Sequence, residues 1–94
     1  MDKLTDGLKH DGGKPRLALV PPEIIEAVGI VMTHGAEKYG KDSYKRVDPE
    51  RYRDALMRHT CAWMRDPQGR DEDSGLPHLY HMACNIAFLL ELDK

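Results

Sequence analysis

PHLYHMACNIAFLLEL, residues 77–92, decides the fold class, because it is the most regular stretch of the sequence. The segment opens on a proline, contains no glycine, and repeats apolar side chains at helical spacing. We predict a helix over residues 77–92. Its core stripe is predicted to be Leu79, Met82, Ala83, Ile86 and Leu90.

Two more helices are predicted upstream of this segment. Asp48, Pro49 and Glu50 combine a capping side chain, a first-turn proline and an acid near the positive end of the helix dipole, which predicts a helix over residues 49–64. The proline pair before residue 23 starts a helix over residues 22–34 that Gly35 ends. The apolar face of the 49–64 helix surrounds His59 and consists of Tyr52, Ala55, Leu56 and Trp63.

Residues 1–20 are rich in glycine and charge, and we predict an irregular arm whose apolar end, residues 17–20, docks on the core. The prediction for residues 1–94 is therefore one all-α domain, a small bundle of three main helices with an irregular N-terminal arm. A chain of 94 residues cannot enclose a ligand alone, so we expect a homo-oligomer that completes the bundle.

Composition narrows the class of partner. Hydrophobic residues make up 40% and charged residues 32%, as in a folded soluble protein, and the formal net charge of -2 argues against duplex nucleic acid. The sequence has no signal-like segment and no long apolar run, so we expect no membrane association and a cytoplasmic protein. Cys61 and Cys84 fall inside predicted helices and are expected to be buried free thiols.

His78, His81 and Asn85 are the first candidates for chemistry, because spacings of three and seven place them on one side of a helix. A histidine pair at this spacing can ligate a metal ion, and the preceding acidic loop offers Asp73 as a third ligand beside Asp71 and Glu72. The alternative is that each histidine packs or caps separately. His59 either joins the group or is a core histidine bonded to a backbone carbonyl.

The second group of candidates could bind phosphate. The arm combines glycines with cations, and the segment after Gly35 adds a lysine beside an aromatic ring. The alternative for the arm is a solvated, non-binding segment. The predicted ligand-binding residues are Lys9, Asp11, Gly13, Lys14, Arg16, Lys38 and Tyr39. Glu23 and Glu26 form a carboxylate pair that binds magnesium only where a second pair faces it.

Four segments taken together resemble the phage dATP/dGTP diphosphohydrolase N-terminal-domain family: KHDGGKPRLALVPPE (9–23), GAEKYGKDSY (35–44), RHTCAW (58–63) and SGLPHLYHMACNIAFLLE (74–91). The resemblance implies a relation to the all-α, MazG-like nucleoside triphosphate pyrophosphatases. Those are obligate oligomers in which facing ExxE and ExxD motifs hold magnesium. Here His78 and His81 stand where an ExxD is expected, which implies a softer metal such as manganese, or no metal.

Three functions are compatible with these features. The first is a phage-type, metal-dependent (deoxy)nucleoside triphosphate diphosphohydrolase that uses Mg or Mn and releases the monophosphate and pyrophosphate. In it Lys14, Arg16 and Lys38 neutralise phosphate charge while His59, Asp73, His78, His81 and Asn85 form the catalytic group. The second is a non-catalytic nucleotide-binding sponge that sequesters a signalling nucleotide of host antiphage defence. The third, a helical protein-binding adaptor, leaves the aligned histidines unexplained.

Overall fold

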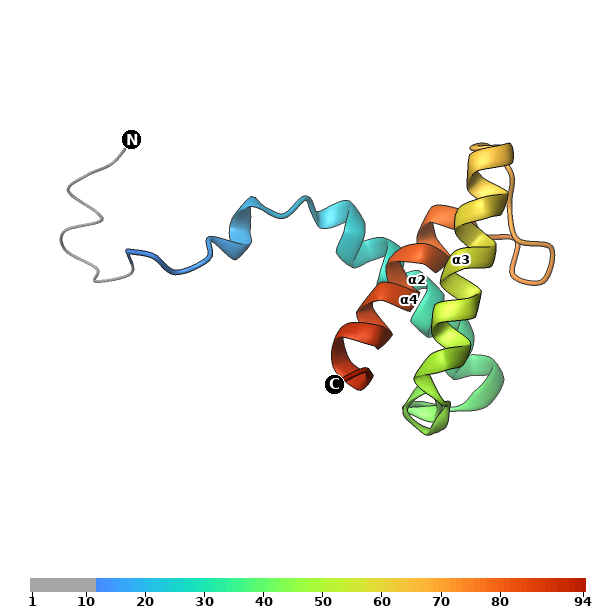
Figure 1. Ribbon diagram of the computed structural model, residues 1–94, viewed down its shortest axis with the longest axis horizontal. Coiled ribbons are helices and arrows are strands. Elements are labelled where there is room, and N and C mark those ends of the chain that lie inside the picture. The colour runs from blue at the N-terminus through green and yellow to red at the C-terminus, as the bar shows by residue number, and fades with distance from the viewer. Residues whose placement is uncertain (1–11) are drawn as a thin grey trace.

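The computed structural model describes residues 12–94, and these form a small all-α bundle, as predicted (Figure 1). Its long helices are α2 (Pro22–Tyr39), α3 (Pro49–Arg65) and α4 (His78–Leu92). Two short 3-10 turns, η1 (Leu17–Leu19) and η2 (Ser43–Arg46), precede α2 and α3 respectively. The helices α3 and α4 match the predicted ranges 49–64 and 77–92 to within one residue at each end.

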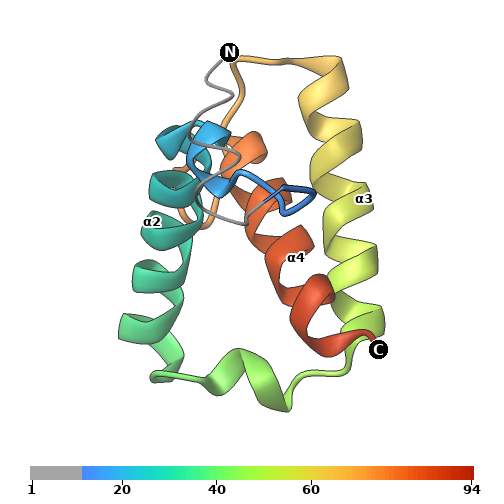
Figure 2. The same cartoon turned by 90° about the vertical axis from the view of Figure 1, so that its left-hand side faces the viewer.

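Helix α4 is the central element, because it packs against both α2 and α3. Figure 2 shows α2 and α3 on opposite sides of α4, joined at one end by the segment that contains η2. The two outer helices pack mainly against α4 rather than against each other.

The start of α3 follows directly from its sequence. The Asp48 carboxylate accepts a hydrogen bond from the Glu50 backbone N–H at 3.0 Å, and Pro49 occupies the first helical position. The segment before it is held by aromatic packing. The Tyr44 ring stacks on Phe88 of α4 with centroids 4.3 Å apart, and the Tyr52 hydroxyl donates to the Tyr44 carbonyl at 2.9 Å. The η2 segment is thereby fixed to both α3 and α4.

The predicted end of the first long helix at residue 34 is wrong. Helix α2 continues through Gly35 to Tyr39. A glycine in a helix interior costs only about 1 kcal/mol relative to alanine, and the good helix formers that follow it outweigh that cost. The helix ends instead at Gly40, whose φ of 93° is disfavoured for residues with a side chain.

The prediction that the end of the arm docks on the core is also wrong. Leu17 and Leu19 are 76% and 68% exposed, and Figure 1 shows the described part of the arm leading away from the bundle. The η1 turn is held by its own backbone, because the Leu19 N–H donates to the Arg16 carbonyl and the Val20 N–H to the Leu17 carbonyl. The extended proline at position 21 then directs the chain into α2.

The rotation of α4 differs from the predicted core stripe. Leu79, Ile86 and Leu90 are 48%, 46% and 76% exposed, whereas Cys84 and Asn85 are buried. The large side chain that sets the rotation is Phe88, which packs on Tyr44 and on Tyr52. Helical spacing places His81, Cys84, Asn85 and Phe88 on one face, so anchoring Phe88 turns all four inward.

The displaced apolar stripe of α4 lies beside exposed apolar residues of α2. A shallow groove of about 300 Å³ runs between the two helices, and all of its lining residues are apolar: Ile24, Ile25, Val28, Ala83, Ile86, Ala87 and Leu90. We call this surface the apolar α2–α4 face. The prediction that both cysteines are buried holds for Cys84 only, because Cys61 is exposed on α3.

Candidate functional site

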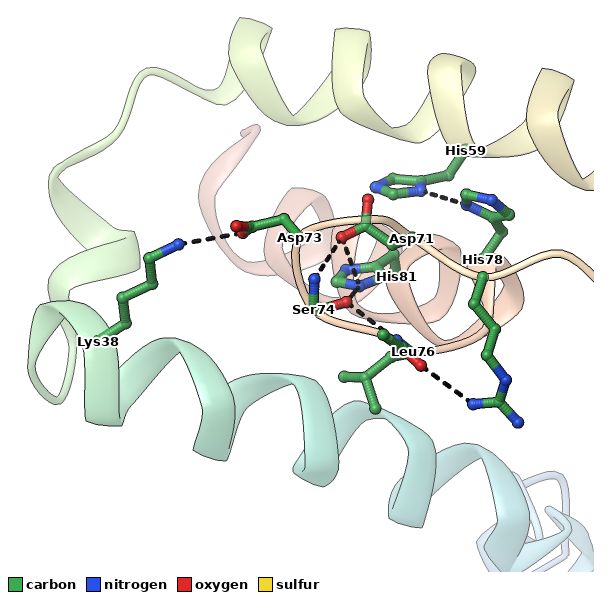
Figure 3. A network of polar contacts seen from close by, with 10 residues as sticks. Lys38, His59, Asp71, Asp73, Ser74, Leu76, His78 and His81 are labelled. Atoms are coloured by element: carbon green, nitrogen blue, oxygen red, sulfur yellow. Dashed lines mark hydrogen bonds and ion pairs between the residues drawn. The ribbon is translucent and has the colours of Figure 1, made fainter.

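A cluster of histidines lies where α3 meets the start of α4. His59 Nδ1 lies 2.9 Å from His78 Nδ1, and the His59 ring stacks on that of His81 with centroids 4.6 Å apart and an interplanar angle of 7°. Figure 3 shows the three rings converging from two helices. The structure therefore favours a shared histidine cluster over separate packing of each ring.

The loop before α4 holds one edge of the His81 ring. Ser74 Oγ lies 2.6 Å from His81 Nε2, and the Asp71 carboxylate lies 3.9 Å from the same nitrogen (Figure 3). The Ser74 N–H donates to the Asp71 carboxylate at 2.8 Å, and the Leu76 N–H donates to Ser74 Oγ at 3.1 Å. Gly75, with φ of 73°, allows the tight turn that brings these groups together.

Burial determines the charge state of the cluster. Desolvation, followed by the neighbouring charge of His81, lowers the pKa of His59 below its ordinary value of 6.5. Desolvation also lowers the pKa of His81, although the Asp71 carboxylate partly opposes that effect. For Asp71, burial opposes ionisation, but hydrogen bonds from Ser74 outweigh it and the pKa is lowered. Both imidazoles are therefore neutral at neutral pH beside an ionised carboxylate.

A cleft of about 970 Å³ lies between α2 and α3, and His59 and His81 line it. Its floor is the inward face of α4, including Cys84 and Asn85. Asn85 is only 7% exposed, and its amide provides donors and an acceptor for a ligand in the cleft. Burial raises the pKa of the Cys84 thiol to about 12, so this cysteine is a packing residue rather than a nucleophile.

The structure brings together some of the predicted catalytic residues and separates others. His59, His81 and Asn85 reach the cleft, and His78 supports His59 from the side. Asp73 points elsewhere, because its carboxylate accepts a hydrogen bond from Lys38 Nζ at 3.0 Å. Among residues 12–94, no three side chains of the metal-binding types are close enough to hold one ion. His78, His81 and Asp73 therefore do not form a joint ligand set in this arrangement.

The predicted ligand-binding residues are also divided. Tyr39 lines the cleft, but Lys38 is engaged with Asp73. Gly13, Lys14 and Arg16 are exposed on the arm that leads away from the bundle (Figure 1). Lys9 and Asp11 lie outside the described residues. Phosphate binding by the arm stays a prediction, and the Glu23–Glu26 pair lies exposed near the start of α2.

Sequence reasoning missed two contributors to the cluster, Ser74 and His34. It named Asp71 only as a possible metal ligand beside Glu72 and Asp73. A sequence signal existed for Asp71 and Ser74, which are three residues apart and are followed by Gly75. This pattern is typical of a side chain that accepts a hydrogen bond from a backbone N–H in a turn. His34 of α2 lies near enough to contribute to lowering the pKa of His81, and its Nε2 is buried with no hydrogen-bond partner. No sequence signal pointed to His34.

The fold and the cleft define a small all-α domain with a pocket that is floored by one helix and lined in part by two neutral histidines. The chain belongs to the family described as "dATP/dGTP diphosphohydrolase, N-terminal", whose profile matches residues 5–94. It is 34% identical over 86 residues to a dATP/dGTP diphosphohydrolase of Salmonella phage PMBT28.

The match covers 92% of this chain but only 29% of that phage protein, so the chain corresponds to less than a third of its relative. No solved structure matches the chain. In the described part of the chain, every helix is too short or too polar to cross a membrane.

Proposed function

We propose that this chain is a nucleotide-binding hydrolytic domain that converts a (deoxy)nucleoside triphosphate to the monophosphate and pyrophosphate. The observation that carries the proposal is a pair of neutral imidazoles in a cleft large enough for a nucleotide: His59 on the α3 wall and His81 on the α4 floor. Membership of the diphosphohydrolase family, and the dATP/dGTP diphosphohydrolase activity for which the phage relative is named, support the same reaction class.

In the proposed reaction a water molecule attacks the α-phosphorus and the α–β bridging bond breaks, with pyrophosphate as the leaving group. A neutral imidazole accepts the proton that the water loses and later returns it to solvent. His81 suits this role, because Ser74 and Asp71 hold its ring and the carboxylate stabilises the charged form. Asn85 orients the ligand or the water from the cleft floor.

Metal dependence, with Mg or Mn, belongs to this proposal as a prediction only. The predicted ligands His78, His81 and Asp73 are turned to different partners, and magnesium prefers oxygen ligands. We therefore derive no step through a metal ion.

The second candidate is the non-catalytic sponge. The lack of a three-residue ligand set among residues 12–94 favours it, because capture needs a binding cleft but no activated water. The sponge retains its nucleotide intact, whereas the hydrolase releases two products.

We also propose that the protein is a homo-oligomer in which a second copy covers the apolar α2–α4 face. Every side chain in that groove is apolar, which disfavours a charged partner. A second copy presents the same apolar surface, so a two-fold axis would bury both faces against each other.

Incubation of the purified protein with a panel of nucleoside triphosphates separates the two candidate functions. The panel includes dATP and dGTP, with EDTA, Mg or Mn, and products are resolved by chromatography. Monophosphate and pyrophosphate in equal amounts support the hydrolase. Tight retention of an unchanged nucleotide under all conditions supports the sponge, and neither cleavage nor retention would overturn both.

A further inference from the structure

The described cations differ in whether they pair with an acid and in whether they line the cleft. Lys38, Lys45 and Arg53 form ion pairs with acids on the outside of the bundle. Four other cations line the cleft, and within residues 12–94 none of them pairs with an acid: Lys41, Arg46, Arg51 and Arg58. Lys14, Arg16, Arg65, Arg70 and Lys94 likewise form no ion pair within residues 12–94, but they do not line the cleft. Four unpaired cations are therefore gathered around one pocket.

The negative charge of the cleft is small by comparison. Asp42 is the carboxylate among the lining residues, and it is 3.7 Å from Lys45. The two lining histidines have lowered pKa values and add no charge at neutral pH. The cleft is thus locally positive, although the chain has a formal net charge of -2. It attracts anions, and its cations repel one another when no anion is bound.

Two of these cations lie on one face of the same helix. Arg51 and Arg58 are seven residues apart on α3, on the same face and about 10.5 Å apart along the axis. His59 and Ala55 lie on the same wall of the cleft. The opposite wall, from α2, is mostly apolar and includes Val31, Met32 and Tyr39. The cleft therefore has a cationic wall and an apolar wall.

We infer that the α3 wall is the phosphate-binding surface of this domain: Arg51 and Arg58 bind the phosphate chain of a nucleotide whose base lies against α2. Guanidinium groups bind phosphate oxygens through paired, charge-assisted hydrogen bonds. The inference rests on the proposed nucleotide function, and it assigns the phosphates to the cleft instead of to the arm residues Lys14 and Arg16. Several phosphates fit the surplus of cations better than one.

Calorimetry on the full chain in EDTA tests the inference, with dATP, inorganic tripolyphosphate and deoxyadenosine as probes. We expect dATP and tripolyphosphate to bind and deoxyadenosine to bind far more weakly. Arg51→Ala and Arg58→Ala should each weaken dATP binding roughly 10- to 100-fold, because each removes charge-assisted hydrogen bonds. Arg51→Lys should lose less, because it keeps the charge.

The matched control is Arg65→Ala, which removes the same side chain from α3 outside the cleft and should leave affinity unchanged. Circular dichroism checks that each variant keeps its helices. Wild-type affinity in both cleft variants, or a loss confined to Lys14→Ala and Arg16→Ala, would overturn the inference while leaving the proposed function standing. Binding of tripolyphosphate without cleavage of any nucleotide would overturn the proposed hydrolysis and leave the phosphate-binding surface standing. If neither dATP nor tripolyphosphate binds, both proposals are overturned.

Discussion

The two long faces of α4 differ in an unusual way: the face that carries polar side chains is turned inward, and the more apolar face is exposed. The face that carries His81, Cys84 and Asn85 points inward, and Cys84 and Asn85 are the residues of α4 that are buried. The opposite face carries Leu79, Ile86 and Leu90, all substantially exposed. Turning His81 and Asn85 inward has a desolvation cost, and the exposed apolar side is the surface on which we propose that a second copy packs.

The two faces of α4 should therefore respond differently to substitution. Substitutions on the inner face should change ligand chemistry and leave assembly intact. Substitutions on the outer face should change assembly and leave the helical fold intact.

On the inner face, His81→Ala should lower turnover of a cleaved nucleoside triphosphate by roughly 10²- to 10⁴-fold, the usual contribution of a general base. Helical content and sedimentation should match the wild type, because the side chain lies at the cleft rather than in a packed core. Steady-state kinetics and circular dichroism measure the two effects. Full activity in this variant would remove His81 from the mechanism, and unfolding would make it a packing residue.

On the outer face, Ile86→Asp should weaken self-association roughly 100-fold, because the assembly would bury an unpaired carboxylate at a cost of about 3 kcal/mol. Sedimentation velocity over a range of concentrations measures the dissociation constant. The control is Glu72→Gln, which changes one charge on the exposed loop away from this face. A wild-type protein that is monomeric at all concentrations would contradict the proposed role of the outer face.

Acidification should act through the two histidines that line the cleft, His59 and His81. Because the folded-state pKa values of His59 and His81 lie below 6.5, the unfolded chain binds protons first as the pH falls. The free energy of unfolding should therefore be constant above about pH 6.5 and should decrease below it, until the folded histidines also titrate. Denaturant unfolding at several pH values measures this, and a flat profile down to pH 5 would show that these rings are not perturbed.

The smallest effect is expected at a site that belongs to neither face. Lys38→Ala breaks an exposed ion pair with Asp73, so turnover should stay within about twofold of the wild type. The same kinetic assay measures it. A large loss of turnover would indicate that Lys38 binds the ligand, as the sequence predicted.

The sequence was informative where structure is set locally. The start of α3 was predictable, because Asp48, Pro49 and Glu50 act within one turn. The rotation of α4 was not, because it depends on Phe88 meeting Tyr44 and Tyr52 from two other elements. Amphipathic reasoning also assumes that the apolar stripe faces the core of the same chain, which fails where exposed apolar surface remains.

The candidate site was predictable in the same uneven way. Helical spacing correctly grouped His81 with Asn85, but it could not choose between Asp71 and Asp73, which differ by two residues in one loop. That choice depends on the turn that Gly75 closes and on the lysine that α2 brings to Asp73. Likewise, nothing in the spacing of Arg51 and Arg58 showed that a cleft lies in front of them.

The contact between the two Nδ1 atoms of His59 and His78 couples the tautomers of these rings. At 2.9 Å one nitrogen must donate and the other accept, so two neutral rings take opposite tautomers. When His59 carries its hydrogen on Nδ1, its Nε2 is an acceptor and His78 carries its own hydrogen on Nε2. A ligand that requires a donor from His59 Nε2 therefore forces the reverse assignment on His78. The chemical character of the cleft is thus set partly by a ring that does not line it.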